Sequence, residues 1–240
     1  THFIPQKPFT KLLTADYSQI ELRIMAHLSK DKELIAAFNS GEDLHSTMAS
    51  LVFGVKPDQV DPEMRRQIKA MSYGLAYGLS AFGLAAQLDI STSEANELMQ
   101  KYLERFGGIQ EYLKSVVAVA KKKGYTETMF GRRRYLPDLN QENKVRREIA
   151  EREALNAPMQ GTAADIIKFA MLNFETLAKR AGIKSRLLLQ VHDELIFEIS
   201  PGEENELERI VREAMGSAAK LAIPLDVNIG IGASWAEAAH

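Results

Sequence analysis

Residues 186–199 read RLLLQVHDELIFEI, two apolar runs separated by a short polar segment at positions 192–194. Aliphatic and β-branched runs on both sides of a short polar break are typical of two antiparallel strands joined by a tight turn. Near the other end of the sequence, residues 9–16 read FTKLLTAD and predict a short strand that ends at Asp16. Strands are therefore expected near both ends of the chain.

The long stretch between these strands has helical periodicity. Ile20, Ile24 and Leu28 share one face of a helix that follows the first strand almost at once. Further helices are predicted at 42–53, from Asp61-Pro62-Glu63 onward, and at 203–220. Two more predicted helices are interrupted: 91–123 has a break at Gly107-Gly108, and 141–181 has an interruption near Asn156-Ala157-Pro158. A loop or hairpin is predicted at 124–140 and a last strand at 225–231. This order predicts an α+β fold in which a large helical insertion separates two halves of a sheet.

The composition is that of a folded protein of 240 residues, 45% hydrophobic and 26% charged. Because the sequence has no cysteine, disulfides, thiolate metal sites and a cysteine nucleophile are excluded. No apolar run approaches the ~20 residues that a membrane-spanning helix needs. The 30 basic and 32 acidic residues nearly cancel, but residues 121–152 carry ten Lys or Arg against five Asp or Glu. This local excess is compatible with a polyanionic partner that the net charge of −2 does not suggest.

Two aspartates lie at the ends of predicted strands. Asp16 closes the first strand and Asp193 lies in the hairpin turn, so both are expected at the rim of the same sheet. One interpretation is that each is an ordinary turn aspartate. The other is a shared Mg²⁺ site, because magnesium prefers a few carboxylates together with water and substrate phosphates. Glu194 would alternate to the other side of the backbone, which makes it the weaker ligand candidate.

Four residues spaced by four positions form a stripe along the helix that begins near Asp61. Arg65, Lys69, Tyr73 and Tyr77 turn by only ~40° per step on an α-helix. The two cations are suited to a triphosphate and an aromatic ring to a sugar and base. The alternative is a half-buried helix with snorkelling basic side chains. Glycines at positions 74 and 78 indicate either a close approach to the backbone or the end of the helix.

Four motifs resemble those of the family A DNA polymerases, the bacterial DNA polymerase I type. Residues 16–23, DYSQIELR, are similar to the first palm motif of that family. The stripe from Arg65 to Tyr77, with its glycines, is similar to the nucleotide-binding fingers helix. Residues 156–165, NAPMQGTAAD, and residues 190–194, QVHDE, match two later motifs. The resemblance extends over nearly the whole chain.

The resemblance implies a fold and a function. The fold is an antiparallel palm sheet with a large helical fingers insertion, divided as palm 1–30, fingers 31–140 and palm 141–240, with thumb and exonuclease domains absent. The function is template-directed DNA synthesis in replication and repair, in which a DNA-directed DNA polymerase transfers deoxynucleotides from dNTPs to a primer 3′-hydroxyl with two Mg²⁺ ions. The implied partners are primer–template DNA and dNTPs without a membrane, for a monomer in the bacterial cytoplasm.

The same resemblance implies a role for each residue that matches a motif. The metal ligands are Asp16, Asp193 and the carbonyl of Tyr17, and Lys69 also acts as a proton donor to pyrophosphate. Glu21 excludes a ribose 2′-hydroxyl, and Tyr77 guards the templating position. The other implied substrate contacts are Arg65, Lys69, Tyr73, Gln19 and His45, and the implied DNA contacts are Arg152, Asn156, Gln160 and His192.

Other classes of function stay open at this point. A single-subunit RNA polymerase shares the palm and fingers, but Glu21 as a bulky gate argues against ribonucleotides. A non-catalytic nucleic-acid-binding module would lack the two aspartates, which are present. A truncated, inactive fragment that retains only nucleotide or nucleic-acid binding is the remaining alternative. Individually, His45 also suits an ordinary surface or capping position, and Gln160 a helix break.

Overall fold

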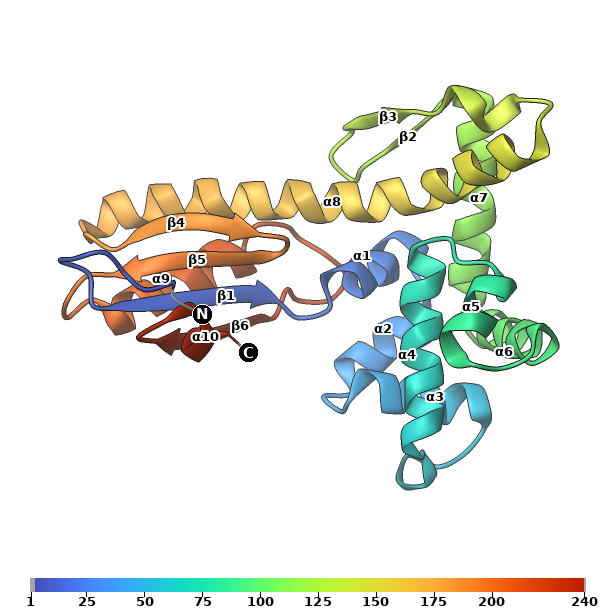
Figure 1. Cartoon of the computed structure of the whole chain (residues 1–240), viewed down its shortest axis with the longest axis horizontal. Coiled ribbons are helices and arrows are strands. Elements are labelled where there is room, and N and C mark those ends of the chain that lie inside the picture. The colour runs from blue at the N-terminus through green and yellow to red at the C-terminus, as the bar shows by residue number, and fades with distance from the viewer. Residues whose placement is uncertain (1–2, 240) are drawn as a thin grey trace. The chain divides into compact units, whose positions relative to one another are not determined.

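The apolar strands at the two ends of the sequence form one antiparallel sheet, shown in Figure 1. A computed structural model describes residues 3–239. The strand order is β4-β5-β1-β6, so the first strand of the chain lies in the interior of the sheet between two late strands. The four strands are β1 (Lys11–Tyr17), β4 (Arg186–Val191), β5 (Glu194–Ile199) and β6 (Val227–Gly232).

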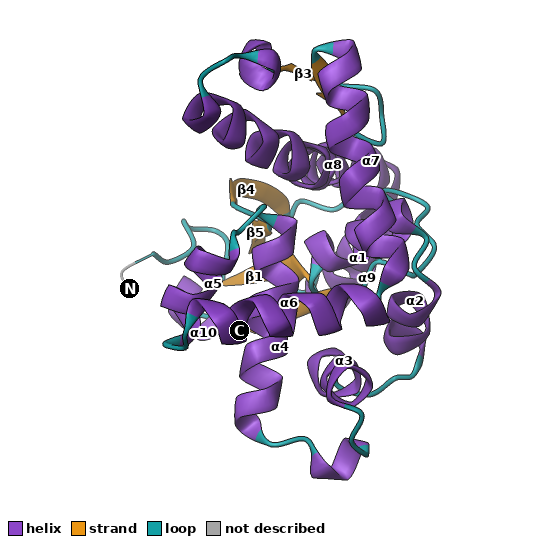
Figure 2. Ribbon diagram, turned by 90° about the vertical axis from the view of Figure 1, so that its right-hand side faces the viewer, coloured by secondary structure: helices purple, strands orange, loops and turns teal. Residues whose placement is uncertain are grey.

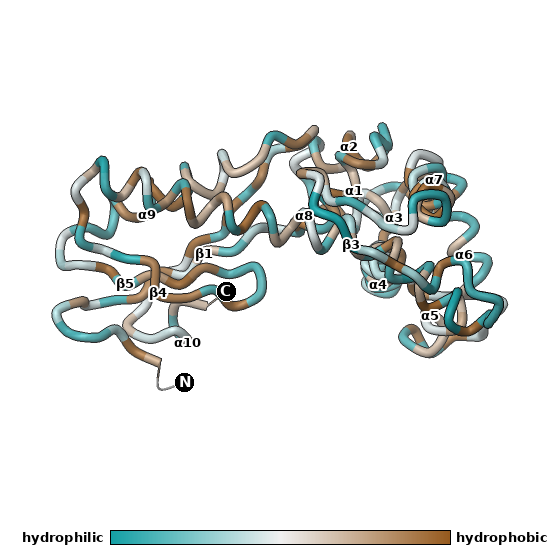
Figure 3. The backbone as a smooth tube through the Cα atoms, turned by 90° about the horizontal axis from the view of Figure 1, so that it is seen from above, coloured by the Kyte–Doolittle hydropathy of each residue, from teal (hydrophilic) through white to brown (hydrophobic). Residues whose placement is uncertain are grey.

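Helices cover both faces of this sheet. On one face, the phenyl ring of Phe174 in α8 (Lys144–Ala181) packs 4.7 Å from that of Phe197 in β5. On the same face, the hydroxyl of Tyr17 donates to the carbonyl of Met215 in α9 (Glu204–Gly216) at 2.8 Å. On the other face, the hydroxyl of Thr14 donates to the carbonyl of Ala238 in α10 (Trp235–Ala238) at 2.7 Å. The interior strand β1 is therefore buried almost throughout, and the strands of the sheet carry hydrophobic stretches in Figure 3.

The helical insertion forms a second compact unit. The chain divides into one unit of Thr1–Ile20 with Ala163–His240, and another of Glu21–Thr162. Figure 2 shows that α1 to α7 of the second unit are helical. They are α1 (Ile20–Ser29), α2 (Lys32–Asn39), α3 (Leu44–Phe53), α4 (Pro62–Ala76), α5 (Ala81–Leu88), α6 (Thr92–Arg105) and α7 (Gly107–Lys123), with a short 3-10 turn at Pro57–Gln59.

Side-chain caps define the starts of these helices. Aspartates at positions 31, 43 and 61 each accept a hydrogen bond from the backbone three residues later. Ser91 and Glu94 form the reciprocal capping box at the start of α6. The core of the second unit includes fully buried Ile68, and the rings of Tyr102 and Phe106, 4.8 Å apart. Burial of these side chains stabilises a set of short helices that propensity alone would not hold.

The segment after α7, for which the sequence predicted a loop or a hairpin, forms a hairpin. Its strands are β2 (Tyr125–Glu127) and β3 (Arg133–Tyr135), and a 3-10 turn follows at Pro137–Asn140. The hairpin region packs on the first half of α8 through a small apolar cluster. Its members are Ala120, Leu136, Leu139, Ala150 and Ala154.

The structure confirms the mixed helical and antiparallel-sheet architecture but corrects the predictions for two helices. Helix α8 runs without a break from Lys144 to Ala181, with Pro158 inside it. A proline in a helix interior costs roughly 3 kcal/mol in isolation. Ala154 before it and Met159 after it are both buried, so tertiary packing holds the helix through the proline. Helix α9 also ends at Gly216, four residues before the predicted end.

Within residues 3–239, no helix combines the length and the apolar character needed to cross a membrane.

Candidate active site

The pairing of β1 with β5 places the two predicted metal-ligand aspartates at the same rim of the sheet. Asp16, near the end of β1, lies directly opposite Glu194 in β5 and Asn228 in β6. Asp193 immediately precedes Glu194 in the chain, so it is the direct neighbour of the cross-strand partner of Asp16. The Asn228 side-chain amide lies 3.4 Å from Oδ2 of Asp16. The sheet register thus joins positions that are 177 residues apart in the sequence.

Two predicted site residues at this rim have left-handed backbone conformations. Gln19, just after β1, and His192, the first residue of the β4–β5 turn, both have φ of 53°. Residues other than glycine adopt this region at a cost of about 1–3 kcal/mol. The carbonyl of His192 accepts a hydrogen bond from the Gln190 side chain at 2.7 Å, which holds the turn. Backbone strain of this kind is concentrated at active sites and ligand-binding sites, where the fold must hold particular side chains in place.

Glu194 lies beside Asp16 at the rim of the sheet, a relation that strand alternation alone does not predict. As the cross-strand partner of Asp16, Glu194 projects from the same face of the sheet as Asp16 does. Its Oε1 accepts a hydrogen bond from the indole N–H of Trp235 at 3.2 Å. The sequence shows no register between the two ends of the chain, so the pairing of Glu194 with Asp16 was not predicted. Asn228 and Trp235 were missed for the same reason.

The chemistry of the rim fits a magnesium ion. Asp193 is exposed and Asp16 is partly exposed, and both supply hard carboxylate oxygens. The side chain of Tyr17 is buried and tied to α9, which fixes the backbone beside Asp16. Among residues 3–239, no three His, Cys, Asp or Glu side chains gather as a protein-only metal site. Mg²⁺ is commonly held by one or two carboxylates with water and substrate phosphates, so two aspartates meet its needs.

The predicted stripe on α4 has a polar face and a buried face. Arg65 and Lys69 are exposed and Tyr73 is half-buried, while Ile68 and Met71 on the other side are buried. The helix ends at Ala76, so Tyr77 is its C-terminal cap residue, 45% exposed. The stripe therefore presents two cations and two aromatic rings along an accessible surface of the helical unit.

Asp43, which the sequence indicated only as part of a helix start, contacts this stripe. Nε and Nη2 of Arg65 donate to the two carboxylate oxygens of Asp43, each at 2.9 Å. These hydrogen bonds hold the pKa of the Asp43 carboxyl well below its usual range. The only available signal in the sequence was an aspartate at a helix start, which gives no partner.

His45 lies beside the same cluster on α3. Its side chain is buried, and its ring centroid is 5.9 Å from that of Tyr73. Burial lowers the pKa of His45, Asp43 opposes this change, and the positive charges of Arg65 and Lys69 add to it. Nε2 of His45 has no hydrogen-bond partner within residues 3–239. The structure thus brings together four of the residues predicted to contact substrate: His45, Arg65, Lys69 and Tyr73.

The two other predicted nucleotide contacts of the helical unit form a pair. The hydroxyl of Tyr77 donates to Oε2 of Glu21, in the first turn of α1, at 2.6 Å. The strong hydrogen bond connects the end of α4 with the start of α1. Directly after it, Gly78 has φ of 67°, and a Cβ there would lie 3.2 Å from the Cα of Arg152. Both explanations offered for the glycines therefore apply: the helix ends and another backbone approaches.

The predicted DNA contacts Arg152, Asn156 and Gln160 are spaced by four along α8 and form a second stripe. Arg152 and Gln160 are exposed. Oδ1 of Asn156 is buried and has no partner within the described residues. His192 is exposed in the β4–β5 turn, on the other unit.

Ion pairs reduce the local excess of positive charge in residues 121–152. Acidic residues pair with five of its cations: Lys121 with Glu151, Lys123 and Arg133 with Glu127, Arg134 with Glu153, and Lys144 with Glu148. Pairs on the surface contribute only about 0–1 kcal/mol, so they constrain these side chains weakly.

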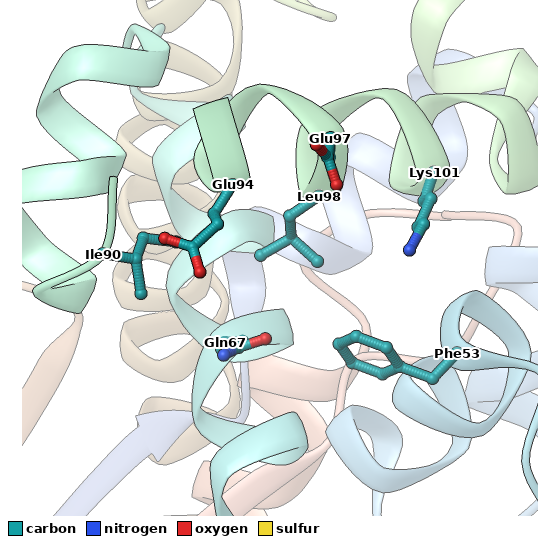
Figure 4. Close-up of a pocket in the computed structure, with 7 residues that line it drawn as sticks. All are labelled: Phe53, Gln67, Ile90, Glu94, Glu97, Leu98 and Lys101. Atoms are coloured by element: carbon teal, nitrogen blue, oxygen red, sulfur yellow. The ribbon is translucent and has the colours of Figure 1, made fainter. Parts of the chain in front are cut away.

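A pocket of about 200 Å³ lies elsewhere in the helical unit, as shown in Figure 4. It is formed by residues of α3, α4 and α6 and the Ile90 position between α5 and α6. Glu94 accepts a hydrogen bond from the backbone of Ser91, and Gln67 donates one to Glu63. These polar groups are engaged in local bonds, and none of the predicted site residues lines this pocket.

Comparison with known proteins identifies the family. A model of DNA polymerase family A matches residues 1–237. The chain therefore belongs to DNA polymerase family A.

Named relatives and a solved structure agree with this assignment. The chain is 60% identical to DNA polymerase I of Mycobacterium tuberculosis strain H37Rv over 99% of its length, and 48% identical to that of Bacillus subtilis over 98%. It covers 26% and 27% of those proteins, so it spans about a quarter of their length. The POL domain of Pol1 from M. smegmatis, solved in complex with DNA primer-template and dNTP, is 61% identical with a TM-score of 0.94. That match covers 99% of this chain and 42% of the other.

Proposed function

We propose that this chain carries the nucleotidyl-transfer centre of a DNA-directed DNA polymerase that functions in bacterial replication and repair. The observation that carries the proposal is the register at the sheet rim, where Asp16 lies opposite the residue next to Asp193 in a chain of DNA polymerase family A. The palm comprises residues 1–30 and 141–240, and the fingers comprise residues 31–140. The substrates are dNTPs and primer–template DNA, and the protein acts as a cytoplasmic monomer.

At the palm rim, Asp16, Asp193 and the carbonyl of Tyr17 would hold two Mg²⁺ ions. Bound Mg²⁺ would supply neutralisation of negative charge for an in-line displacement at phosphorus. The left-handed turn at His192 orients Asp193, and the Tyr17 side chain anchors the strand that presents Asp16. No covalent nucleophile is required, because phosphoryl transfer depends mainly on positioning and charge stabilisation.

On the fingers, Arg65, Lys69 and His45 bind the triphosphate. Gln19 is a further proposed contact of the substrate. Arg65 provides a planar fork for phosphate oxygens, and Lys69 supplies a point charge and a proton for the departing pyrophosphate. Tyr73 contacts the sugar and base.

Selection of the sugar and contact with DNA fall to other residues. Glu21, held by the Tyr77 hydroxyl, fills the position of a ribose 2′-hydroxyl and so selects deoxynucleotides. Tyr77 also guards the templating position. Arg152, Asn156, Gln160 and His192 contact the primer–template, where amide side chains suit minor-groove acceptors that all base pairs present alike.

Single-nucleotide incorporation into a labelled primer–template tests this function. With Mg²⁺ and the complementary dNTP, the chain should extend the primer, and Asp193→Asn should lower the rate at least about 100-fold, because it removes one metal-ligating charge. Glu194→Gln is the matched control. It removes the neighbouring charge but keeps an oxygen for the Trp235 hydrogen bond, and its rate should stay within about tenfold of the wild type.

Two results would contradict the proposal. One is an Asp193→Asn variant as active as the wild type, which would exclude the metal assignment. The other is a folded wild-type chain that neither extends a primer nor binds a dNTP, which would favour a fragment without this function.

A further inference from the structure

The guanidinium of Arg65 already holds an anion in this structure. Two parallel N–H···O hydrogen bonds of 2.9 Å join its Nε and Nη2 to the Asp43 carboxylate. A phosphate group presents two oxygens to arginine in the same bidentate manner. Asp43 therefore occupies the part of Arg65 that a triphosphate would use, if Arg65 has the role proposed above.

Asp43 is fixed by a second bond while it makes this pair. Its Oδ2 accepts the backbone N–H of Ser46 at 2.9 Å and so caps α3. Both partners of the ion pair are nevertheless accessible, because the side chains of Arg65 and Asp43 are 44% and 43% exposed. An exposed pair of this kind is weak enough for a more highly charged anion to replace it.

The surroundings of Arg65 favour such a replacement. Lys69, one turn along α4, forms no ion pair with any residue between 3 and 239, so its charge stays available to an incoming anion. His45 adds a buried imidazole on the same side, close enough for the charges of Arg65 and Lys69 to act on it. A triphosphate can contact several of these groups at once, whereas Asp43 contacts only Arg65.

We propose that Asp43 is a specificity-determining residue that occupies the Arg65 fork until a triphosphate displaces it. The inference rests on the proposed function of Arg65 and extends it. A ligand binds Arg65 only if its phosphate charge is sufficient to displace the Asp43 carboxylate. A ligand without phosphate therefore gains no binding free energy from Arg65. The displaced carboxylate keeps its place as the α3 cap.

The variant Asp43→Asn isolates this effect. Asparagine caps a helix as well as aspartate does, so α3 should keep its start. It lacks the charge that makes the pair with Arg65, so the fork becomes available. The affinities of inorganic tripolyphosphate and of dTTP, each with Mg²⁺, can be measured by titration calorimetry on the full 240-residue chain. We expect both dissociation constants to fall about three- to fivefold, the effect of removing one exposed ion pair.

Asp61→Asn is the matched control. Asp61 is also an exposed capping aspartate, it lies at the start of the helix that carries Arg65, and its Oδ1 accepts the backbone N–H of Met64 at 2.7 Å. This variant removes the same charge without an ion pair to Arg65, and we expect less than about a twofold change. An equal gain in affinity in both variants would overturn the proposal, since net charge alone would explain it. Weaker binding by Asp43→Asn would also overturn it, because Asp43 would then position Arg65 for the ligand.

Arg65→Ala separates this proposal from the proposed function. If Arg65→Ala leaves both affinities unchanged, the triphosphate role of Arg65 is wrong. If it weakens binding and Asp43→Asn has no further effect in that background, the exchange acts through Arg65 as proposed. If Asp43→Asn still tightens binding without Arg65, the function stands and the exchange is wrong.

Discussion

His45 combines a buried imidazole with a charged neighbourhood. Asp43 precedes it by two residues, and Arg65 and Lys69 face it from α4. Burial and the two cations disfavour the protonated ring more than Asp43 favours it, so the pKa of His45 is lowered from the ordinary value of 6.5. Above pH 6.5 the neutral ring therefore predominates in the folded chain, and it can donate or accept a hydrogen bond.

This lowered pKa predicts a pH dependence of stability. The unfolded chain binds the proton at the ordinary pKa of 6.5 and the folded chain only at lower pH, so the unfolded state holds more protons between the two values. Stability is thus fully present above 6.5 and is lost as the pH falls from there through the pKa of the folded state. His45→Gln should reduce the loss in unfolding free energy between about pH 7.5 and about pH 5.5, a window above most carboxyl titrations.

Urea unfolding of both proteins at the two pH values measures this difference. At the higher pH, the variant should be destabilised by about 1 kcal/mol through lost packing, which is a separate effect. If the variant lost as much stability as the wild type on acidification, His45 would not be the group responsible.

At the scale of elements, the end of α4 shows how backbone and side-chain requirements combine. The helix stops at Ala76, and Gly78 turns the chain with φ of 67° where the backbone of Arg152 in α8 is close. The turn also places Tyr77 where its hydroxyl reaches Glu21. The geometry of a proposed nucleotide contact therefore depends on a residue without a side chain.

Substitution of Gly78 by alanine should be more destabilising than its conformation alone explains. A left-handed alanine costs roughly 1–2 kcal/mol, and the added Cβ would lie 3.2 Å from both Cα and Cγ of Arg152. Gly41→Ala is the matched control, because Gly41 has a similar φ of 74° and nothing within 4 Å of the added Cβ. We expect Gly78→Ala to lose at least about 1 kcal/mol more than Gly41→Ala in denaturant unfolding. Equal losses would show that Arg152 yields without cost.

Local signals in the sequence predicted most elements, and contacts distant in the sequence account for what it missed. The caps at Asp61 and Ser91 were visible because capping is decided within four residues. Pro158 predicted an interruption, because the sequence alone does not show that Ala154 and Met159 beside it are buried in the folded chain. The motifs indicated the candidate site residues, but the pairing of Asp43 with Arg65 and of Glu194 with Asp16 depends on tertiary structure.

At the scale of the whole molecule, each of the two units has its own core. Leu13 and Phe197 are fully buried in the sheet unit, and Ile68 and Phe106 in the helical unit. Trp235, the sole tryptophan of the sequence, lies in the sheet unit. It packs edge-on against Phe3 and donates to Glu194 in β5. Its fluorescence therefore reports on the sheet unit, whereas far-UV circular dichroism is dominated by helices, most of which belong to the other unit.

Separate cores predict that the two units lose structure at different denaturant concentrations. Cooperative units of a chain open with their own free energies, and two probes then give transitions that do not coincide. Gly78→Ala, which acts in the helical unit, should move the circular dichroism midpoint to lower urea and leave the Trp235 midpoint nearly unchanged. Because a single cooperative unit would respond as a whole, coincident curves that shift together in the variant would contradict this expectation. Urea titration of both proteins with both probes on the same samples decides between a chain that unfolds as one unit and a chain in which the sheet unit and the helical unit are stabilised separately.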